Sequence, residues 1–164
     1  MEGLRRRHPR EQGDIGERAA VEWLWRAGAV VFVPFGHSPD FDLVAAFDSR
    51  LYRIEVKTST RLIAAGRPRY CVQLVTYGGN QSWNGLVKPF RPQRCDFVFI
   101  LVGNGRRWFI PSSSITTKRS ISVGAAKWGD FAVDDRDAQS KARRLLEWPS
   151  SQGGAPELES RARL

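Results

Sequence analysis

The 164-residue sequence has few of the features that mark membrane, secreted or zinc-binding proteins. Its apolar stretches, such as 29–35 and 97–102, have the length of strands and fall short of the roughly 18 residues that a transmembrane helix needs. The basic N-terminus lacks the apolar stretch of a signal peptide. Two cysteines and two histidines, without paired ligand spacing, exclude a disulfide framework and argue against structural zinc. We therefore expect a cytoplasmic protein without membrane contact.

Positive charge is in excess. Lysine and arginine total 26 against 17 aspartate and glutamate residues, which gives a formal net charge of +9. This balance favours a polyanionic partner, although an arginine-rich composition that serves solubility would give the same numbers. The length suits one globular domain. We predict that this domain spans 11–148, with a basic arm at 1–10 and a disordered tail at 149–164.

Hydrophobic periodicity and turn signals predict helices at 13–27 and 134–148, the second capped by Asp134 or Asp135. Predicted strands cover 30–34, 41–47, 51–58, 70–76, 96–102 and 106–110. The turn at 48–50 makes 41–47 and 51–58 an antiparallel hairpin. Strand 96–102 is the most hydrophobic, which predicts a central position, whereas 61–68 is typical of a basic linker.

The first unusual residue is Glu17. At 100° per residue, Glu17 shares a helix face with Ala20 and Leu24, the face that should pack on the sheet. A carboxylate on that face must be paired, neutralised or bound to a cation. The ordinary alternative is that Glu17 lies at the edge of this face and bonds Arg18 or Arg53.

The second unusual feature lies in the hairpin. Strand periodicity places Glu55 and Lys57 on one face, and Asp42 converges on them from the start of the neighbouring strand. Two carboxylates suit Mg²⁺, which keeps several waters and takes further ligands from substrate phosphates. A lysine beside such an ion would orient the attacking water or stabilise the transition state. The alternative is a cross-strand salt bridge between Lys57 and either acid.

These segments resemble a known nuclease family. The sequences SPDFDLV at 38–44 and EVK at 55–57 resemble the PD-(D/E)XK nuclease superfamily, in which an acid opens one strand and an acid-x-lysine follows on the next. GERAA at 16–20 resembles the first-helix acid of archaeal Holliday junction resolvases and of PD-(D/E)XK homing endonucleases from group I introns. Strands 96–102 and 106–111 resemble the later strands of the homing-endonuclease-like group, so the resemblance covers 13–111.

The resemblance implies an α/β, restriction-endonuclease-like fold with a mixed sheet of about five strands flanked by helices. It implies a Mg²⁺-dependent DNA endonuclease of homing type, with Mn²⁺ able to substitute and no nucleotide cofactor. Asp42 and Glu55 would hold the metal, and Lys57 would position the water and stabilise charge. Glu17 would be either an outer ligand of the metal or an acid that contacts the metal's ligands. A homodimer would supply two sites for double-strand cuts. A junction-resolving nuclease and an inactive DNA-binding module of the same fold are the alternatives.

Three further residues near the motif have open roles. Asp40 follows Pro39 as the motif's name suggests, but Asp42 directly precedes the apolar part of its strand. We therefore expect Asp42 to be the main ligand, with Asp40 assisting or capping the loop. His37 either serves as a proton donor or phosphate contact, or is simply solvated. Gln73 either contacts the site or pairs across the sheet.

Basic residues later in the chain are interleaved with aromatic ones. Such cations bind phosphates without reading sequence, and aromatic rings can stack on bases. The alternative for Trp83 and Phe90 is a small core under a long loop. The cations proposed to contact nucleic acid are Arg61, Arg67, Arg69, Lys88, Arg91 and Arg94, with a second group at Lys118, Arg119 and Lys127.

Overall fold

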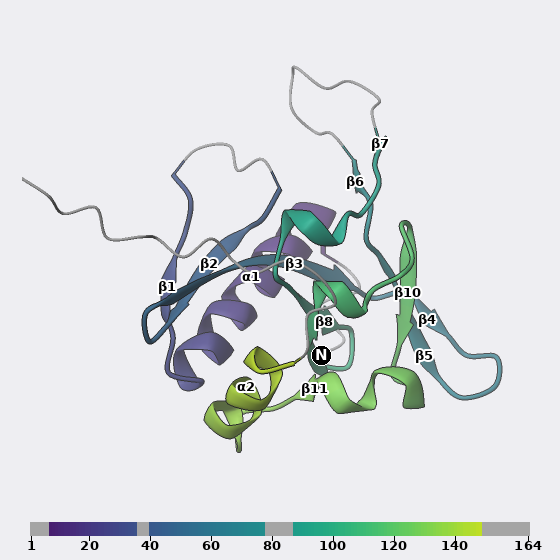
Figure 1. Cartoon of the computed structure of the whole chain (residues 1–164). Helices are drawn as coiled ribbons and strands as arrows, with labels where there is room; N and C mark the ends of the chain where they lie inside the picture. The colour runs from purple at the N-terminus through teal and green to yellow at the C-terminus, as the bar shows by residue number, and fades with distance from the viewer. Residues whose placement is uncertain (1–6, 36–39, 78–86, 149–164) are drawn as a thin grey trace, which may run out of the picture.

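A six-stranded mixed sheet forms the centre of the computed structural model (Figure 1), which describes residues 7–35, 40–77 and 87–148. The strand order is β1-β2-β3-β8-β9-β11, with β3 and β8 parallel and all other neighbours antiparallel. The α/β class and the predicted hairpin are confirmed. The strands are β1 (Val30–Phe32), β2 (Leu43–Phe47), β3 (Arg50–Ser59), β8 (Phe97–Val102), β9 (Arg107–Pro111) and β11 (Ala132–Val133).

A second, three-stranded sheet has the order β10-β5-β4, and β6 pairs with β7. The prediction of a linker at 61–68 is wrong because this stretch contains β4. Two residues are too few to show the alternation of apolar and polar residues by which a strand is predicted, so β4 could not be predicted. The elements are β4 (Leu62–Ile63), β5 (Arg69–Gln73), β6 (Thr76–Tyr77), β7 (Val87–Lys88) and β10 (Ser120–Val123), with the 3₁₀ turns η2 (Pro92–Arg94), η3 (Ser112–Ser114) and η4 (Ala126–Phe131).

Two helices lie against the large sheet: α1 (Pro9–Arg26) and α2 (Ala138–Leu146). Helix α1 begins four residues before the predicted start because a proline fits the first helical turn, where its missing N–H costs nothing. The prediction that Asp134 or Asp135 caps α2 is wrong. Asp134 instead accepts a hydrogen bond from the Arg136 amide in a local turn. None of the described helices has the length and apolarity to cross a membrane.

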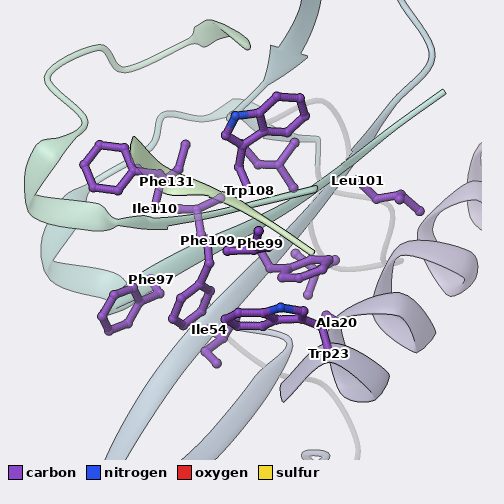
Figure 2. Close-up of a cluster of buried hydrophobic side chains, with 14 of the residues drawn as sticks. Ala20, Trp23, Ile54, Phe97, Phe99, Leu101, Trp108, Phe109, Ile110 and Phe131 are labelled. Carbon is purple, nitrogen blue, oxygen red and sulfur yellow. The ribbon is translucent and has the colours of Figure 1, made fainter. Parts of the chain in front are cut away.

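The core lies between α1 and the central strands. Trp23 of α1 is fully buried, with its ring centroid 6.0 Å from that of Phe99 and 5.0 Å from that of Phe109. Figure 2 shows these rings on one side of the strands and Trp108 and Ile110 on the other. All six residues of β8 are buried, which confirms its predicted central position.

The two faces of β3 have different neighbours. Val56 and Thr58 point toward α1, where a Cβ built on Gly16 would lie 3.3 Å from Val56 Cγ1 and overlap Thr58 Oγ1. The absence of a side chain at Gly16 therefore lets α1 approach β3 closely. Ser59 points the other way, and its hydroxyl donates to the Cys71 carbonyl of β5 at 2.6 Å. By strand alternation, Glu55 and Lys57 share the face of Ser59, toward the second sheet.

Candidate active site

The candidate site lies where two strands of the large sheet part. Strand β2 begins at Leu43, opposite Ile54, whereas β3 continues to Ser59 with only β8 beside it in this sheet. Asp42 stands at the fork. Its backbone amide donates to the Ile54 carbonyl at 2.9 Å, and its Oδ2 accepts the Val56 amide at 2.7 Å. The carboxylate thus takes the place of a strand partner and is fixed beside Glu55 and Lys57.

A cavity of about 150 Å³ opens at this fork. Glu17 reaches it from α1, Asp42 from the start of β2, and Glu55 and Lys57 from β3. The acids at 42 and 55 therefore open onto one space and do not point to opposite sides of the sheet. Other residues lining the cavity include Asp40, Leu74, Thr76, Lys88, Phe90, Arg91 and Arg94.

The two central carboxylates are largely withdrawn from water. Burial raises the pKa of Asp42, and the hydrogen bond from the Val56 amide and the charge of Lys57 oppose this shift only in part. Burial also raises the pKa of Glu55, against the opposing effect of Lys57. Two acids with raised pKa values in one cavity favour the entry of a cation or a proton.

Lys57 is paired along its own strand. Its Nζ lies 2.5 Å from Glu55 Oε1 and 3.5 Å from Thr76 Oγ1, and the side chains of Lys57 and Glu55 are 16% and 12% exposed. The alternative of a salt bridge between Lys57 and one of the acids is therefore observed for Glu55, within one strand; Asp42 forms no ion pair with the described residues. Lys57 therefore neutralises Glu55 and leaves the charge of Asp42 without a direct counter-ion.

Glu17 approaches Asp42 from the helix side. Burial raises the pKa of Glu17, and the negative charge of Asp42 raises it further. The ordinary alternative of a bond to Arg18 or Arg53 is absent among the described residues. Arg53 is held instead by Asp96, with its Nη2 3.0 Å from Oδ1 and its Nε 3.2 Å from Oδ2. Within the part of the chain that the structure describes, Glu17 is thus an acid without an ion-pair partner, close enough to Asp42 to feel its charge.

The other predicted site residues divide into two groups. Asp40 lines the cavity but turns to its basic side, with Oδ1 3.3 Å from Arg94 Nη1 and 3.9 Å from Lys88 Nζ. Gln73 does not line the cavity; it is exposed in β5, in register with Ser120. Of the six predicted nucleic-acid contacts, Lys88, Arg91 and Arg94 line the cavity, whereas Arg61, Arg67 and Arg69 lie in and around β4 and β5.

The prediction that aromatic residues stack on bases is corrected for Phe90. Phe90 is 4% exposed and belongs to the hydrophobic core, so it has no face free for a base. His37 and Trp83 lie outside the described residues. Two residues that position the site, Gly16 and Thr76, were missed. A glycine in mid-helix, directly before an acid, was the available signal for Gly16; no pattern pointed to Thr76.

The donor set fits a hard divalent cation. Within the described ranges, no three His, Cys, Asp or Glu side chains lie close enough to form a complete metal site. Mg²⁺ does not need such a cage, because it is commonly held by one or two carboxylates together with waters and substrate phosphates. Asp42 and Glu55, buried on one cavity with raised pKa values, match that requirement.

Comparison with known proteins relates the chain to a family of endonucleases and to a solved structure. A family model described as PD-(D/E)XK endonuclease matches residues 7–125. The solved structure of a bacterial homing endonuclease, I-Ssp6803I, is similar to this chain with a TM-score of 0.66 and 21% sequence identity, over 86% of this chain and 99% of that one. This likeness confirms the predicted fold. No curated protein matches the chain.

Proposed function

Because the chain belongs to the PD-(D/E)XK endonuclease family, we propose that it hydrolyses DNA phosphodiester bonds with the help of Mg²⁺, for which Mn²⁺ can substitute. The observation that carries this proposal is the meeting of Asp42, Glu55 and Lys57 on one small cavity at the fork between β2 and β3. Glu55 is paired with Lys57, whereas Asp42 has no ion-pair partner among the described residues, and a buried carboxylate without such a partner is costly unless a proton or a cation neutralises it.

The residues have separate tasks in this proposal. Asp42 and Glu55 would hold the cation, which would supply charge stabilisation at the phosphate and a more acidic water. Lys57 donates a hydrogen bond to the attacking water or to a phosphate oxygen as negative charge develops there. Glu17, which lines the same cavity as Asp42, orients water there. Thr76 offers Lys57 a neutral hydroxyl partner.

The proposed substrate is that of a homing endonuclease: duplex DNA that is cut at a specific site. The likeness to a solved homing endonuclease over nearly the whole of that chain supports this choice. A junction-resolving nuclease would use the same three side chains, so the substrate distinguishes the two. A module that binds DNA without cleaving it would need none of the three.

A nicking assay tests the proposal. Supercoiled plasmid, linear duplex and a four-way junction are incubated with wild type and with Lys57→Ala, in Mg²⁺, Mn²⁺ or EDTA. The proposal expects metal-dependent cleavage of duplex that Lys57→Ala abolishes. Preferential cutting of the junction would replace the homing-type assignment with the resolvase type. Absence of Lys57-dependent cleavage on every substrate would leave the binding module.

We also propose that the protein acts as a homodimer, because cutting both strands requires two catalytic centres. Strand β1 supports this proposal: it is an edge strand among the described strands, and Figure 1 shows it at the left end of the large sheet. Val30 and Phe32 are 61% and 52% exposed there. An edge strand that meets its own copy across a twofold axis pairs both its backbone and its apolar side chains.

A groove of about 870 Å³ beside β1 extends this apolar surface. It is lined by Val21, Trp25 and Val33 together with charged residues of α1, and Trp25 is 77% exposed. A second copy that paired at β1 would bring the groove of each protomer against the other, so one contact would cover both features.

A further inference from the structure

The segment from the end of β7 to the end of η2 presents three cations to the cavity at a spacing of three residues. Lys88, Arg91 and Arg94 all line the cavity, and we call them the cationic rim. The residues between and after them are anchored, since Phe90 is 4% exposed and Cys95 is 1% exposed. The cationic rim is therefore carried on a segment whose own apolar residues are fixed in the core.

Hydrogen bonds hold the same segment in place. The buried hydroxyl of Ser112 lies 2.9 Å from the Pro92 carbonyl oxygen and 2.6 Å from that of Cys95, at the two ends of η2. The Phe90 amide donates to the Lys118 carbonyl at 2.9 Å. A cation on such a support loses little freedom when it binds an anion, which is what a preorganised phosphate site requires.

Asp40 forms ion pairs with two residues of the cationic rim. Its Oδ1 lies 3.3 Å from Arg94 Nη1 and 3.9 Å from Lys88 Nζ, and its side chain is 33% exposed. Among the residues that the structure describes, four acids (Glu17, Asp40, Asp42 and Glu55) and four bases (Lys57, Lys88, Arg91 and Arg94) line the cavity, so the formal charges of these eight cancel. These side chains therefore add no net positive charge to the attraction of DNA until one acid is neutralised or a cation enters.

We propose that the cationic rim is the site for a DNA phosphate and that Asp40 occupies this site until DNA arrives. A carboxylate and a phosphate are interchangeable partners for arginine, because both offer oxygens in the geometry that a guanidinium binds. Asp40 thus acts as an internal substitute for the phosphate and not as a second metal ligand beside Asp42. This inference deepens the proposed function, since it names where the substrate backbone lies relative to the cutting residues.

A supporting role for Asp40 in DNA binding predicts the opposite effect of its removal on affinity. If Asp40 instead held Lys88 and Arg94 in the position that DNA needs, its removal would weaken binding. Asp40→Asn keeps the shape of the side chain and removes the charge, so it separates the two roles. Asp48→Asn is the matched control: it makes the same change of charge in the hairpin turn, where the backbone at φ 51° suits asparagine.

The experiment measures DNA affinity in EDTA, by fluorescence anisotropy of a labelled duplex across a series of salt concentrations. Asp40→Asn is expected to bind about threefold to tenfold tighter than wild type, with a steeper dependence on salt because more cations meet phosphates. Arg94→Gln is expected to bind more weakly and with a shallower salt dependence. Arg143→Gln, at an exposed position of α2 outside the cavity, controls for the loss of one positive charge.

Tighter binding by Asp40→Asn than by Asp48→Asn, together with weaker binding by Arg94→Gln than by Arg143→Gln, would support the proposal. Equal or weaker binding by Asp40→Asn, or no binding by any form, would overturn it. Thermal melting checks that each variant is folded. No divalent cation is present, so the result does not depend on cleavage; a protein that passes this test but cuts nothing would reject the nuclease proposal alone.

Discussion

The carboxylate of Asp42 accepts the backbone amide of Val56 at 2.7 Å, between the two residues of β3 that complete the candidate site. This bond joins the start of β2 to β3 beyond their last paired residues, so the position of the acid is set by the backbone of the strand that carries Glu55 and Lys57. The contact that shapes the fork in the sheet therefore also positions the Asp42 carboxylate, which we propose as a metal ligand.

The first prediction concerns the charge of Asp42. Asp42→Asn keeps an oxygen that can accept the Val56 amide but removes a metal ligand. We expect the melting temperature in EDTA to be unchanged or higher, and cleavage to fall about a thousandfold. Calorimetric titration with Mn²⁺ should show binding by wild type and none by the variant. Asp130→Asn, at an exposed position of η4, should behave as wild type; equal Mn²⁺ binding by both variants would contradict this role of Asp42.

The second prediction separates Lys57 from metal binding. Lys57→Ala removes the group that acts on the reacting water or phosphate, so we expect cleavage to fall about a hundredfold to a thousandfold. Affinity for Mn²⁺ should rise, because Glu55 loses the ammonium that competes for its carboxylate. Lys127→Ala, which removes an exposed lysine that lies over Trp128, is the control. A variant that loses Mn²⁺ binding would show that Lys57 only shapes the site.

The third prediction follows from the raised pKa values of Asp42, Glu55 and Glu17. The folded protein keeps protons on these acids to a higher pH than the unfolded chain does. Their contribution to the free energy of unfolding is therefore largest below the ordinary carboxyl range and is lost as the pH rises through the raised values. Urea unfolding in EDTA should show this loss, and Glu55→Gln should make it smaller.

Saturating Mg²⁺ should reverse the effect at neutral pH, because the cation binds only the ionised carboxylates of the folded state. The comparison is made at constant ionic strength, with Ca²⁺-free buffers and the same urea series. A free energy of unfolding that does not change with Mg²⁺ would contradict the assignment of these acids to a metal.

The fourth prediction compares two glycines on the same helix. A Cβ at Gly16 would overlap Thr58 Oγ1, whereas a Cβ at Gly13 would have no heavy atom within 4 Å. Gly16→Ala should destabilise the protein by about 1–3 kcal/mol and impair cleavage, since it pushes α1 and Glu17 away from β3. Gly13→Ala should stabilise it by about 0.5–1 kcal/mol through helix propensity. Chemical denaturation measures both; equal effects would exclude a close helix-strand contact.

The hairpin and the face shared by Glu55 and Lys57 could be predicted from the sequence, because alternation within a long strand is a local property. The second sheet could not be predicted, because its strand β4 is only two residues long. The orientation of the Asp40 side chain could not be predicted from the sequence either, because it depends on Arg94, a residue distant in sequence that only folding brings close. The sequence also left open whether Phe90 contacts a base or packs in a core. Periodicity is weak around η2, and the burial of Phe90 comes from the core beneath it.

The fifth prediction concerns the edge strand. Phe32→Glu places a charge on the exposed face of β1, where a second copy is proposed to pair. Sedimentation velocity should show a dimer for wild type at micromolar concentration and a monomer for the variant. Leu62→Glu, at a residue of β4 that is 40% exposed, is the control and should remain dimeric. A monomeric wild type would contradict the proposed dimer without affecting the assignment of the cutting residues.

Anomalous diffraction from a crystal soaked in Mn²⁺ tests the central claim most directly. A manganese peak that touches the carboxylates of both Asp42 and Glu55, with the Lys57 ammonium displaced from Glu55, is the predicted result. Full manganese occupancy elsewhere, with Lys57 still bound to Glu55 and no peak at Asp42, would show that the three side chains form an ordinary buried ion pair and not a catalytic centre.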